Sequence, residues 1–332
     1  MNFLFYGFRH VHVLDCYRMA QANPNVRILA AIEENTPARH AAQEKLGISI
    51  AADGYDRWLA DPNVDAVVIG GTYGDRGQAI IQALQHGKHV LSDKPVCTSL
   101  AELEEIRTLA REKQRKVGCL LDLRKTPAVA TVKTLLESGR MGTIHNISFN
   151  GQHCIDYANR PDWYFAPGKH GGTINDIAIH GIDLVTYLTG QRIDRVDCAK
   201  VWNAFADRHP NFCDCAMFMA QTDGGAHILA DVSYAAPSQV FSMPTYWSFQ
   251  IWCSGGLISF CYADSNVTIY ENGASQPEVL PGIPATDTMI DDFIEEVQQN
   301  TTHFTESVLA ASETALQIQQ VADTTTNMGV TL

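Results

Sequence analysis

The chain has 332 residues, 45% of them hydrophobic and 18% charged, which is normal for two average domains. Its formal net charge is -13 and no basic stripe is present, so nucleic acid and anionic membranes are excluded as expected partners. The nine cysteines lack the spacing of a zinc site and the density of a disulfide scaffold, and no stretch is long and apolar enough to cross a bilayer. This cysteine usage indicates a reducing cytosol, and no basic residue precedes the first apolar run as it would in a signal sequence, so a cytoplasmic location is expected.

Residues 1–121 alternate short apolar runs with segments of helical period, a pattern typical of a parallel sheet covered by helices on both faces. A helix is predicted over 99–113, where Ser99 and Glu102 form a capping box. The predicted strands are 3–6, 26–32, 66–70, 89–91 and 117–121. This region is therefore predicted to be an α/β, doubly wound dinucleotide-binding domain, a Rossmann domain.

Residues 122–332 have a different sequence pattern, in which apolar and polar residues alternate with period two over longer predicted strands. Ile228, Ala230, Val232 and Tyr234 line one face of such a strand, and Trp247, Phe249, Ile251 and Cys253 line one face of another. Helices are predicted over 126–137, 173–188, 289–299 and 306–322. The second domain, 122–332, is therefore predicted to be α+β with an open, mainly antiparallel sheet.

The turn after the first predicted strand carries part of a dinucleotide-binding fingerprint. A full Gly-x-Gly-x-x-Gly would place glycine at 7, 9 and 12, but only Gly7 is present, and Arg9 and His12 occupy the other positions. Gly7 allows a sharp turn into a helix whose N-terminal amides face a pyrophosphate. With Arg9 and His12 in place, we expect the phosphates to lie farther out or to be held by side chains.

Glu33 follows the second predicted strand, 21 positions after His12. A carboxylate at about this spacing accepts hydrogen bonds from the ribose hydroxyls and repels the extra phosphate of NADP. NAD is therefore favoured over NADP. The alternative is a solvated acidic loop formed by Glu33, Glu34 and Asn35.

Lys94 and Pro95 follow the fourth predicted strand, at the sheet edge where open α/β sheets bind ligands. Pro95 biases the Lys94 backbone away from helical geometry. Such a lysine can hold a substrate hydroxyl or act in proton transfer. The alternative is a lysine in a loop that faces solvent.

In the second domain, Asp176, His180 and Asp183 are spaced by four and three residues, which places them on one face of a helix. An imidazole beside a carboxylate is what a general acid/base needs. The trio could instead bind a metal, or Asp176 could cap the helix with His180 in the core.

Together these motifs resemble the glucose-fructose oxidoreductase, inositol dehydrogenase and rhizopine-catabolism superfamily, Gfo/Idh/MocA. Four signatures match in order and spacing: the Gly7 turn, the run from Gly87 to Pro95, Trp163-Tyr164-Phe165, and Gly171-Gly172 with Asp176, His180 and Asp183. The resemblance implies NAD(P)-dependent oxidation or reduction of a hydroxyl on a sugar, polyol or related acid. It also implies a homodimer or homotetramer formed through the C-terminal sheet.

The resemblance further implies roles for individual residues. Lys94 would contact the reacting hydroxyl near the nicotinamide, His180 would be the catalytic acid/base, and Asp176 would bind substrate or orient His180. The expected cofactor-binding residues are Gly7, Phe8, Arg9, His10, His12, Glu33, Gly71, Thr72, Tyr73, Asp93, Lys94 and Pro95. The expected substrate-binding residues are Lys94, His153, Tyr157, Arg160, Asp176 and His180, and no metal is expected.

The chain departs from the family pattern in three places. The glycine-rich turn is reduced, and Asp93 stands where glutamate is common. Tyr73, Gly74 and Gly77 stand where the family often shows Pro, Asn and His.

Two other functions stay open: a catalytically impaired nucleotide- or sugar-binding regulatory protein on the same fold, and a reductase of aldehydes or imines. The polar residues Asp156, Asn159, Arg160 and Asp162 argue against the apolar pocket that such a reductase needs.

Overall fold

The computed structural model describes residues 1–325, and these divide into two compact units. The first unit contains residues 1–121, 166–171 and 287–312, and the second contains the remainder. The predicted boundary after residue 121 coincides with the first change of unit. The segments 166–171 and 287–312 were expected in the second domain, but they pack with the first unit. The functions assigned to the two domains stay a prediction.

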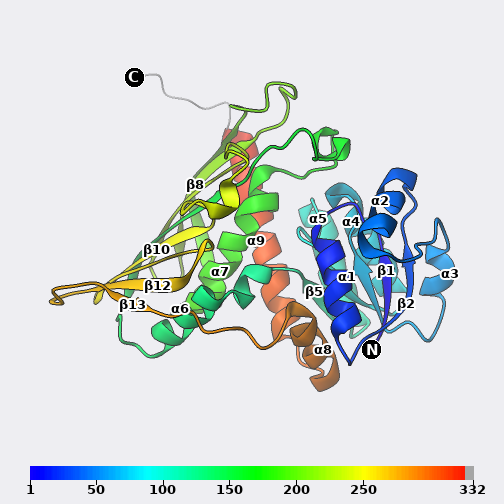
Figure 1. Cartoon of the computed structure of the whole chain (residues 1–332), viewed down its shortest axis with the longest axis horizontal. Helices are drawn as coiled ribbons and strands as arrows, with labels where there is room; N and C mark the ends of the chain where they lie inside the picture. Colours follow the sequence, from blue (N-terminus) through cyan, green and yellow to red (C-terminus); the bar gives the residue numbers. More distant parts are fainter. Residues whose placement is uncertain (326–332) are drawn as a thin grey trace. The chain divides into compact units, whose positions relative to one another are not determined.

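The first unit is built on a five-stranded parallel sheet with the strand order β2-β1-β3-β4-β5 (Figure 1). Its strands are β1 (Asn2–Tyr6), β2 (Arg27–Ile32), β3 (Ala66–Ile69), β4 (His89–Ser92) and β5 (Val117–Cys119). Phe3, Leu4, Phe5 and Val67 are fully buried, as expected of parallel strands covered on both faces. The prediction of a doubly wound α/β domain is confirmed. The strand order reverses between β1 and β3, and ligands bind open α/β sheets at such a point.

Helices connect these strands and add the C-terminal part of the unit. They are α1 (His12–Ala22), α2 (Thr36–Leu46), α3 (Tyr55–Leu59), α4 (Tyr73–Gln85), α5 (Leu100–Glu112), α8 (Met289–Gln299) and the first half of α9 (His303–Thr325). The Ser99 side chain caps α5, as predicted, but the Glu102 carboxylate accepts Gln78 Nε2 and does not complete the predicted capping box. Helix α8 joins the unit because Phe293 packs on Phe3 of β1 and Asn23 bonds Asp291.

The second unit contains an eight-stranded sheet with the order β13-β12-β11-β10-β6-β9-β8-β7. Its strands are β6 (Ile144–Gln152), β7 (Ile193–Trp202), β8 (Cys215–Thr222), β9 (His227–Ser233), β10 (Ser248–Cys253), β11 (Gly256–Cys261), β12 (Asp264–Glu271) and β13 (Glu278–Leu280). Only β6 and β9 pair in parallel among these described strands. The predicted large, mainly antiparallel sheet is confirmed.

Helices α6 (Pro127–Glu137) and α7 (Ile179–Thr189) cover one face of this sheet (Figure 1). The predicted inward face of β9 is buried at Ile228, Ala230 and Val232, because alternate side chains point to the same side. Short 3₁₀ turns lie at Asp122–Lys125, Asp162–Phe165 and Val240–Ser242, and a π-turn lies at Ile174–Ala178.

Within the described residues, no helix has the length and apolar character needed to span a membrane. The predicted cytoplasmic location stays a prediction.

Candidate active site

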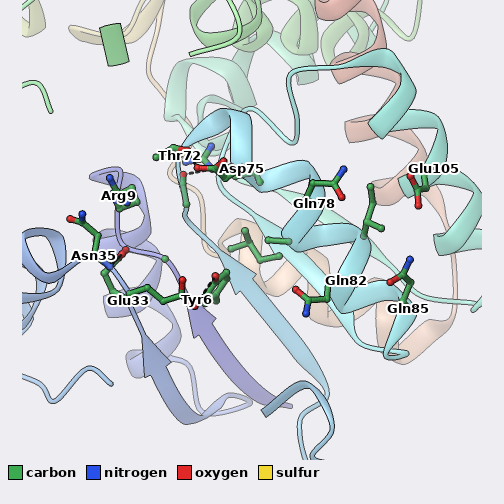
Figure 2. A pocket seen from close by; sticks show the side chains of 17 residues that line it. Tyr6, Arg9, Glu33, Asn35, Thr72, Asp75, Gln78, Gln82, Gln85 and Glu105 are labelled. Atoms are coloured by element: carbon green, nitrogen blue, oxygen red, sulfur yellow. Dashed lines mark hydrogen bonds between the residues drawn. The ribbon is translucent and has the colours of Figure 1, made fainter. Parts of the chain in front are cut away.

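A cavity of about 570 Å³ opens in the first unit at the carboxyl ends of β1, β2 and β3. Figure 2 shows Arg9, Glu33 and Asn35 from the turns after β1 and β2, with Thr72 and Asp75 from the start of α4. This is the point of strand-order reversal at which open α/β sheets take ligands. Five of the predicted cofactor-binding residues line the cavity: Gly7, Arg9, Glu33, Gly71 and Thr72.

Gly7 is required by the geometry of the turn after β1. Its φ is +84°, and a Cβ atom there would lie 2.6 Å from the backbone nitrogen of Gly71. The backbone N–H groups of this turn already have acceptors within the protein. Those of Gly7 and Arg9 donate to Ile32 O and Gly70 O at 2.9 Å, and that of Phe8 donates to the Glu33 carboxylate at 2.6 Å. A phosphate at this turn would therefore be held by side chains such as Arg9 or by the N-terminus of α1.

Glu33 is 3% exposed, so the alternative of a solvated acidic loop is wrong for this residue. Its carboxylate accepts N–H groups from Phe8 at 2.6 Å and Asn35 at 2.8 Å. These two bonds hold the carboxylate at the cavity wall, where it can accept further hydrogen bonds from hydroxyl groups. Glu34, by contrast, is exposed and accepts the Tyr6 hydroxyl at 3.3 Å.

The opposite wall of the cavity was not predicted. Helix α4 presents Gln78, Gln82 and Gln85 to the cavity (Figure 2), at the i, i+4 and i+7 spacing of one helix face. Their spacing could have identified them, because a polar stripe with helical period next to the ligand edge of the sheet is a candidate wall. Tyr6, stacked on Tyr55 with ring centroids 3.7 Å apart, was also missed.

Lys94 is 3% exposed, so it is not a loop lysine that faces solvent. Its ammonium lies 5.7 Å from the centre of the buried Tyr73 ring, and the Lys94–Pro95 peptide bond is cis. The ring of His10 lies 5.5 Å from the same Tyr73 ring. Lys94, Tyr73 and His10, three predicted cofactor-site residues, are thus brought together within the first unit.

The carboxylate of Asp93 is fully buried next to these residues. It accepts His10 Nδ1 and the Arg76 guanidinium, each at 2.8 Å, and its other oxygen lies 3.4 Å from His12 Nδ1. Burial would raise the pKa of Asp93, but the charge of Arg76 and the hydrogen bond from His10 outweigh it and hold the pKa well below its usual range. Burial also lowers the pKa of His10 to about 3, so its imidazole is neutral at pH 7.

His10, His12 and Asp93 each offer a ligand atom, and these atoms lie within 4.8 Å of one another. Such a trio could hold a metal ion. However, the Arg76 guanidinium already pairs with Asp93 at 2.8 Å, and a second cation beside it would be repelled. The arrangement therefore fits a hydrogen-bonded network better than a metal centre.

Gly74, which departs from the family pattern at the start of α4, has a structural explanation. The N–H of Gly74 donates to Lys169 O at 2.9 Å, and Lys169 pairs with Asp75 at 2.5 Å. A Cβ at position 74 would lie 2.0 Å from Gly168 O. The small residue at 74 therefore lets the segment 166–171 pack against α4.

In the second unit, Asp176 lies inside the π-turn Ile174–Ala178 and not at a helix cap, so the capping alternative is wrong. Its buried carboxylate accepts the hydroxyl of the buried Tyr234. Burial first, and the Asp176 charge second, raise the pKa of Tyr234 well above its ordinary value, so its hydroxyl keeps its proton. π-turns recur at functional sites because they shift side chains out of helical register.

His180 and Asp183 follow on α7, and their contacts differ from those of Asp176. The imidazole of His180 is buried against Trp247, with ring centroids 5.3 Å apart, and its Nδ1 is 4.0 Å from Asp122 Oδ1. Asp183 forms a two-point buried ion pair with Arg124, whose Nε lies 2.7 Å from Asp183 Oδ2. Residues spaced by four and three lie on one face only in a continuous α-helix, but regular α geometry begins only at Ile179. Asp183 therefore has a structural role of its own.

The predicted substrate residues of the second unit fall into two groups. His153 lies 5.6 Å from Trp247 and 6.3 Å from Tyr234, ring to ring, and the Arg160 guanidinium lies 4.9 Å from the Tyr234 ring. Tyr157 belongs to another cluster, since its hydroxyl donates to Asp207 at 3.3 Å and its ring packs on His209. Tyr234 and Trp247 therefore link His153, Arg160, Asp176 and His180, whereas Tyr157 contacts different residues.

Two family models match this chain. Residues 9–120 match the model described as "Oxidoreductase family, NAD-binding Rossmann fold", and residues 129–259 match the "GFO/IDH/MocA C-terminal domain". The levoglucosan dehydrogenase of Pseudarthrobacter phenanthrenivorans is 28% identical over 177 residues, 52% of this chain and 44% of that protein. The scyllo-inositol 2-dehydrogenase (NAD(+)) of Bacillus subtilis is 30% identical over 207 residues, 60% of this chain and 57% of that protein.

These matches span about half the length of the two curated relatives. A solved structure of a levoglucosan dehydrogenase in complex with NADH and levoglucosan superposes with a TM-score of 0.82 at 19% identity, covering 98% of this chain and 97% of that one. At this identity the likeness supports the fold. The two family models and the observed architecture agree, and the chain belongs to the Gfo/Idh/MocA oxidoreductase family, with an NAD-binding Rossmann fold.

Proposed function

We propose that the protein is an NAD-dependent oxidoreductase that transfers a hydride between the cofactor and a hydroxyl of a sugar, polyol or sugar acid. The main support is that one unit carries both features that such a reaction needs. These are the cavity beside the Gly7 turn, lined by the buried Glu33, and the buried Lys94. The relatives named as levoglucosan, inositol and xylose dehydrogenases support the substrate class.

The cavity suits a dinucleotide in two respects. Gly7 keeps the turn open where a Cβ atom would meet the backbone of Gly71, and Glu33 offers a fixed carboxylate to ribose hydroxyls. Because Glu33 and Glu34 are adjacent negative charges at the cavity wall, they disfavour the additional phosphate of NADP. Arg9 is the side chain suited to hold a diphosphate.

A bound nicotinamide would supply the hydride acceptor, and the chain's own residues would bind the substrate hydroxyl and remove its proton. We infer that the Lys94 ammonium holds the reacting oxygen and stabilises negative charge that develops on it. His180 takes the hydroxyl proton, and Asp122 can support the charge that it gains. Asp176, held by the Tyr234 hydroxyl, binds a neighbouring substrate hydroxyl.

The test is Lys94→Ala in the full chain, with NAD and a panel of scyllo-inositol, myo-inositol, levoglucosan and D-xylose. We expect turnover to fall by about 1,000-fold or more, because a preorganised charge is lost, while NADH binding followed by fluorescence stays measurable. Lys113→Ala, at the exposed end of α5, is the matched control. Unchanged turnover in Lys94→Ala would show that Lys94 takes no part in the reaction. An absence of NADH binding up to millimolar concentration would favour a regulatory protein instead.

We also propose a homodimer or homotetramer formed through the outer face of the eight-stranded sheet. This face carries exposed apolar side chains, among them Met219 on β8, Leu229 on β9 and Trp252 on β10, which are 46%, 53% and 48% exposed. Met219 and Leu229 are paired neighbours, and β6 separates them from Trp252. Exposed apolar patches rimmed by polar residues are typical of an interface. We expect Leu229→Glu to shift the mass measured by light scattering toward the monomer, and an unchanged mass would exclude this face.

A further inference from the structure

Arg76 is a fully buried arginine to which the sequence assigns no role. It lies in the first turn of α4, between the cofactor cavity and the Asp93-Lys94-Pro95 segment. Arginine is almost never fully buried unless its charge and its five N–H donors are satisfied. The contacts of its guanidinium therefore indicate what this residue is for.

The guanidinium bonds to four acceptors. Its Nε donates to Gly71 O at 2.9 Å, and one terminal nitrogen donates to both Lys94 O and Pro95 O, the latter at 3.2 Å. Its other terminal nitrogen donates to the Asp93 carboxylate at 2.8 Å. Its planar face also lies over the Tyr73 ring, 4.6 Å from the ring centre. Two consecutive carbonyls and the preceding carboxylate of the Lys94 segment are thus held by one rigid group.

The network continues from Asp93 to His10. An ionised carboxylate only accepts hydrogen bonds, so His10 must carry its hydrogen on Nδ1, which leaves Nε2 as the basic nitrogen. The pKa of His10, lowered to about 3 by burial, agrees with a neutral ring in this single tautomer. Arg76 donates to the same Asp93 oxygen, Oδ2, that His10 contacts, and so fixes the position of the acceptor that His10 needs.

We propose that Arg76 is a positioning residue, which holds the Lys94 backbone directly and orients the His10 imidazole through Asp93. This inference rests on the proposed function, because Lys94 is the residue whose placement matters for hydride transfer. Asp93, which stands where the family commonly has glutamate, is the carboxylate that Arg76 and His10 share. At another departure, a Cβ atom at Gly77 would lie 2.5 Å from the Glu102 carboxyl group, so a larger residue at position 77 requires the Glu102 side chain to move.

A direct readout is the tautomer of His10, which does not depend on any substrate. In the full chain labelled with ¹⁵N-histidine, long-range ¹H–¹⁵N spectra report which ring nitrogen carries the hydrogen, and His10→Gln identifies the signal. We expect a single Nδ1–H tautomer in the wild type. In Arg76→Met the charge that lowers the pKa of the buried Asp93 is lost, and a protonated carboxyl can donate to Nδ1, so we expect a mixture of tautomers. Retention of the single tautomer in Arg76→Met would overturn the proposal, as would a stoichiometric divalent metal bound by His10, His12 and Asp93, which would displace that hydrogen.

Measurements of kcat and of the NADH Kd in Arg76 variants then distinguish a positioning role of Arg76 from a purely structural one. We expect Arg76→Met to lower kcat by about 100-fold while the NADH Kd changes less, and Arg76→Lys to fail to rescue it, because an ammonium cannot span four acceptors. The double variant Arg76→Met/Asp93→Asn removes both buried charges, so it regains folding stability relative to Arg76→Met but not kcat. Recovery of kcat along with stability would overturn the proposal.

Arg57→Met, at an exposed position on α3, is the matched control and should behave as the wild type. If the wild type turns over none of the substrates, the proposed function fails, whereas the His10 tautomer still decides the role of Arg76.

Discussion

The carboxylate of Glu33, just after β2, accepts the backbone N–H of Phe8 in the turn after β1 at a distance of 2.6 Å. This bond ties together the two turns that form one wall of the cofactor cavity. It also makes Glu33 part of the turn itself, because the Phe8 amide that could face a phosphate is directed at a protein carboxylate.

Glu33→Gln keeps an acceptor for the Phe8 amide but removes the charge. We expect NADH binding to weaken by about 10-fold or more, since hydrogen bonds to charged groups contribute about 1.5–3 kcal/mol. The ratio of NADH affinity to NADPH affinity should fall at the same time, because a charge that repels the extra phosphate of NADPH is lost. Both affinities are measured by fluorescence titration, with Glu44→Gln on the exposed face of α2 as the control for charge. Unchanged NADH affinity would show that Glu33 does not contact the cofactor.

Gly74→Ala should destabilise the protein, because the new methyl group would lie 2.0 Å from the Gly168 carbonyl oxygen, a backbone atom that cannot rotate away. We expect a loss of about 1–3 kcal/mol or more in the free energy of unfolding, measured by urea denaturation. Gly71→Ala is the control, since a Cβ at 71 meets no atom within 4 Å. Equal stability of the two variants would mean that segment 166–171 does not pack on α4 in solution.

The His10–Asp93 pair should make the protein less stable in acid. The folded pKa of His10, about 3, is below the unfolded value of 6.5, so between these values the unfolded chain binds more protons. Stability is therefore lost as pH falls from 6.5 toward 3, by an amount on the order of a few kcal/mol. The low pKa of Asp93 acts in the same direction, because its stabilisation is present above the ordinary carboxyl pKa and is lost below it.

Urea midpoints measured from pH 7 to 4 test this expectation. His10→Gln should flatten the profile, because the residue that gains a proton on unfolding is gone. Val11→Ala alters the exposed neighbouring residue without removing a titrating group and should keep the wild-type slope. A slope that is the same in His10→Gln and the wild type would contradict the low pKa.

Tyr234→Phe removes a hydroxyl that donates to Asp176, a buried carboxylate in the π-turn. We expect a loss of about 1–3 kcal/mol of stability, because a charged acceptor is left with one fewer partner. If Asp176 binds substrate, KM should rise more than kcat falls. Tyr262→Phe, at a residue that is 51% exposed, controls for the loss of a hydroxyl. Wild-type stability and KM in Tyr234→Phe would argue against both roles.

Local patterns in the sequence predict the order and type of the elements. Alternation at 228, 230 and 232 predicts the buried face of β9, and the Ser99 cap predicts the start of α5, because both signals depend on neighbouring residues. The family resemblance singled out Lys94, Asp176 and His180, and the structure buries all three.

Which side chains meet depends on the packing of the elements and has no such local signal. Arg76 pairs with Asp93, Gly74 accommodates Gly168, and Asp176 receives the hydroxyl of Tyr234 from just beyond β9. The π-turn likewise moves Asp176 out of the register that α-helical spacing predicts. Periodicity reports how a residue relates to its helix or strand, whereas contacts between residues far apart in the chain are set by how those elements pack.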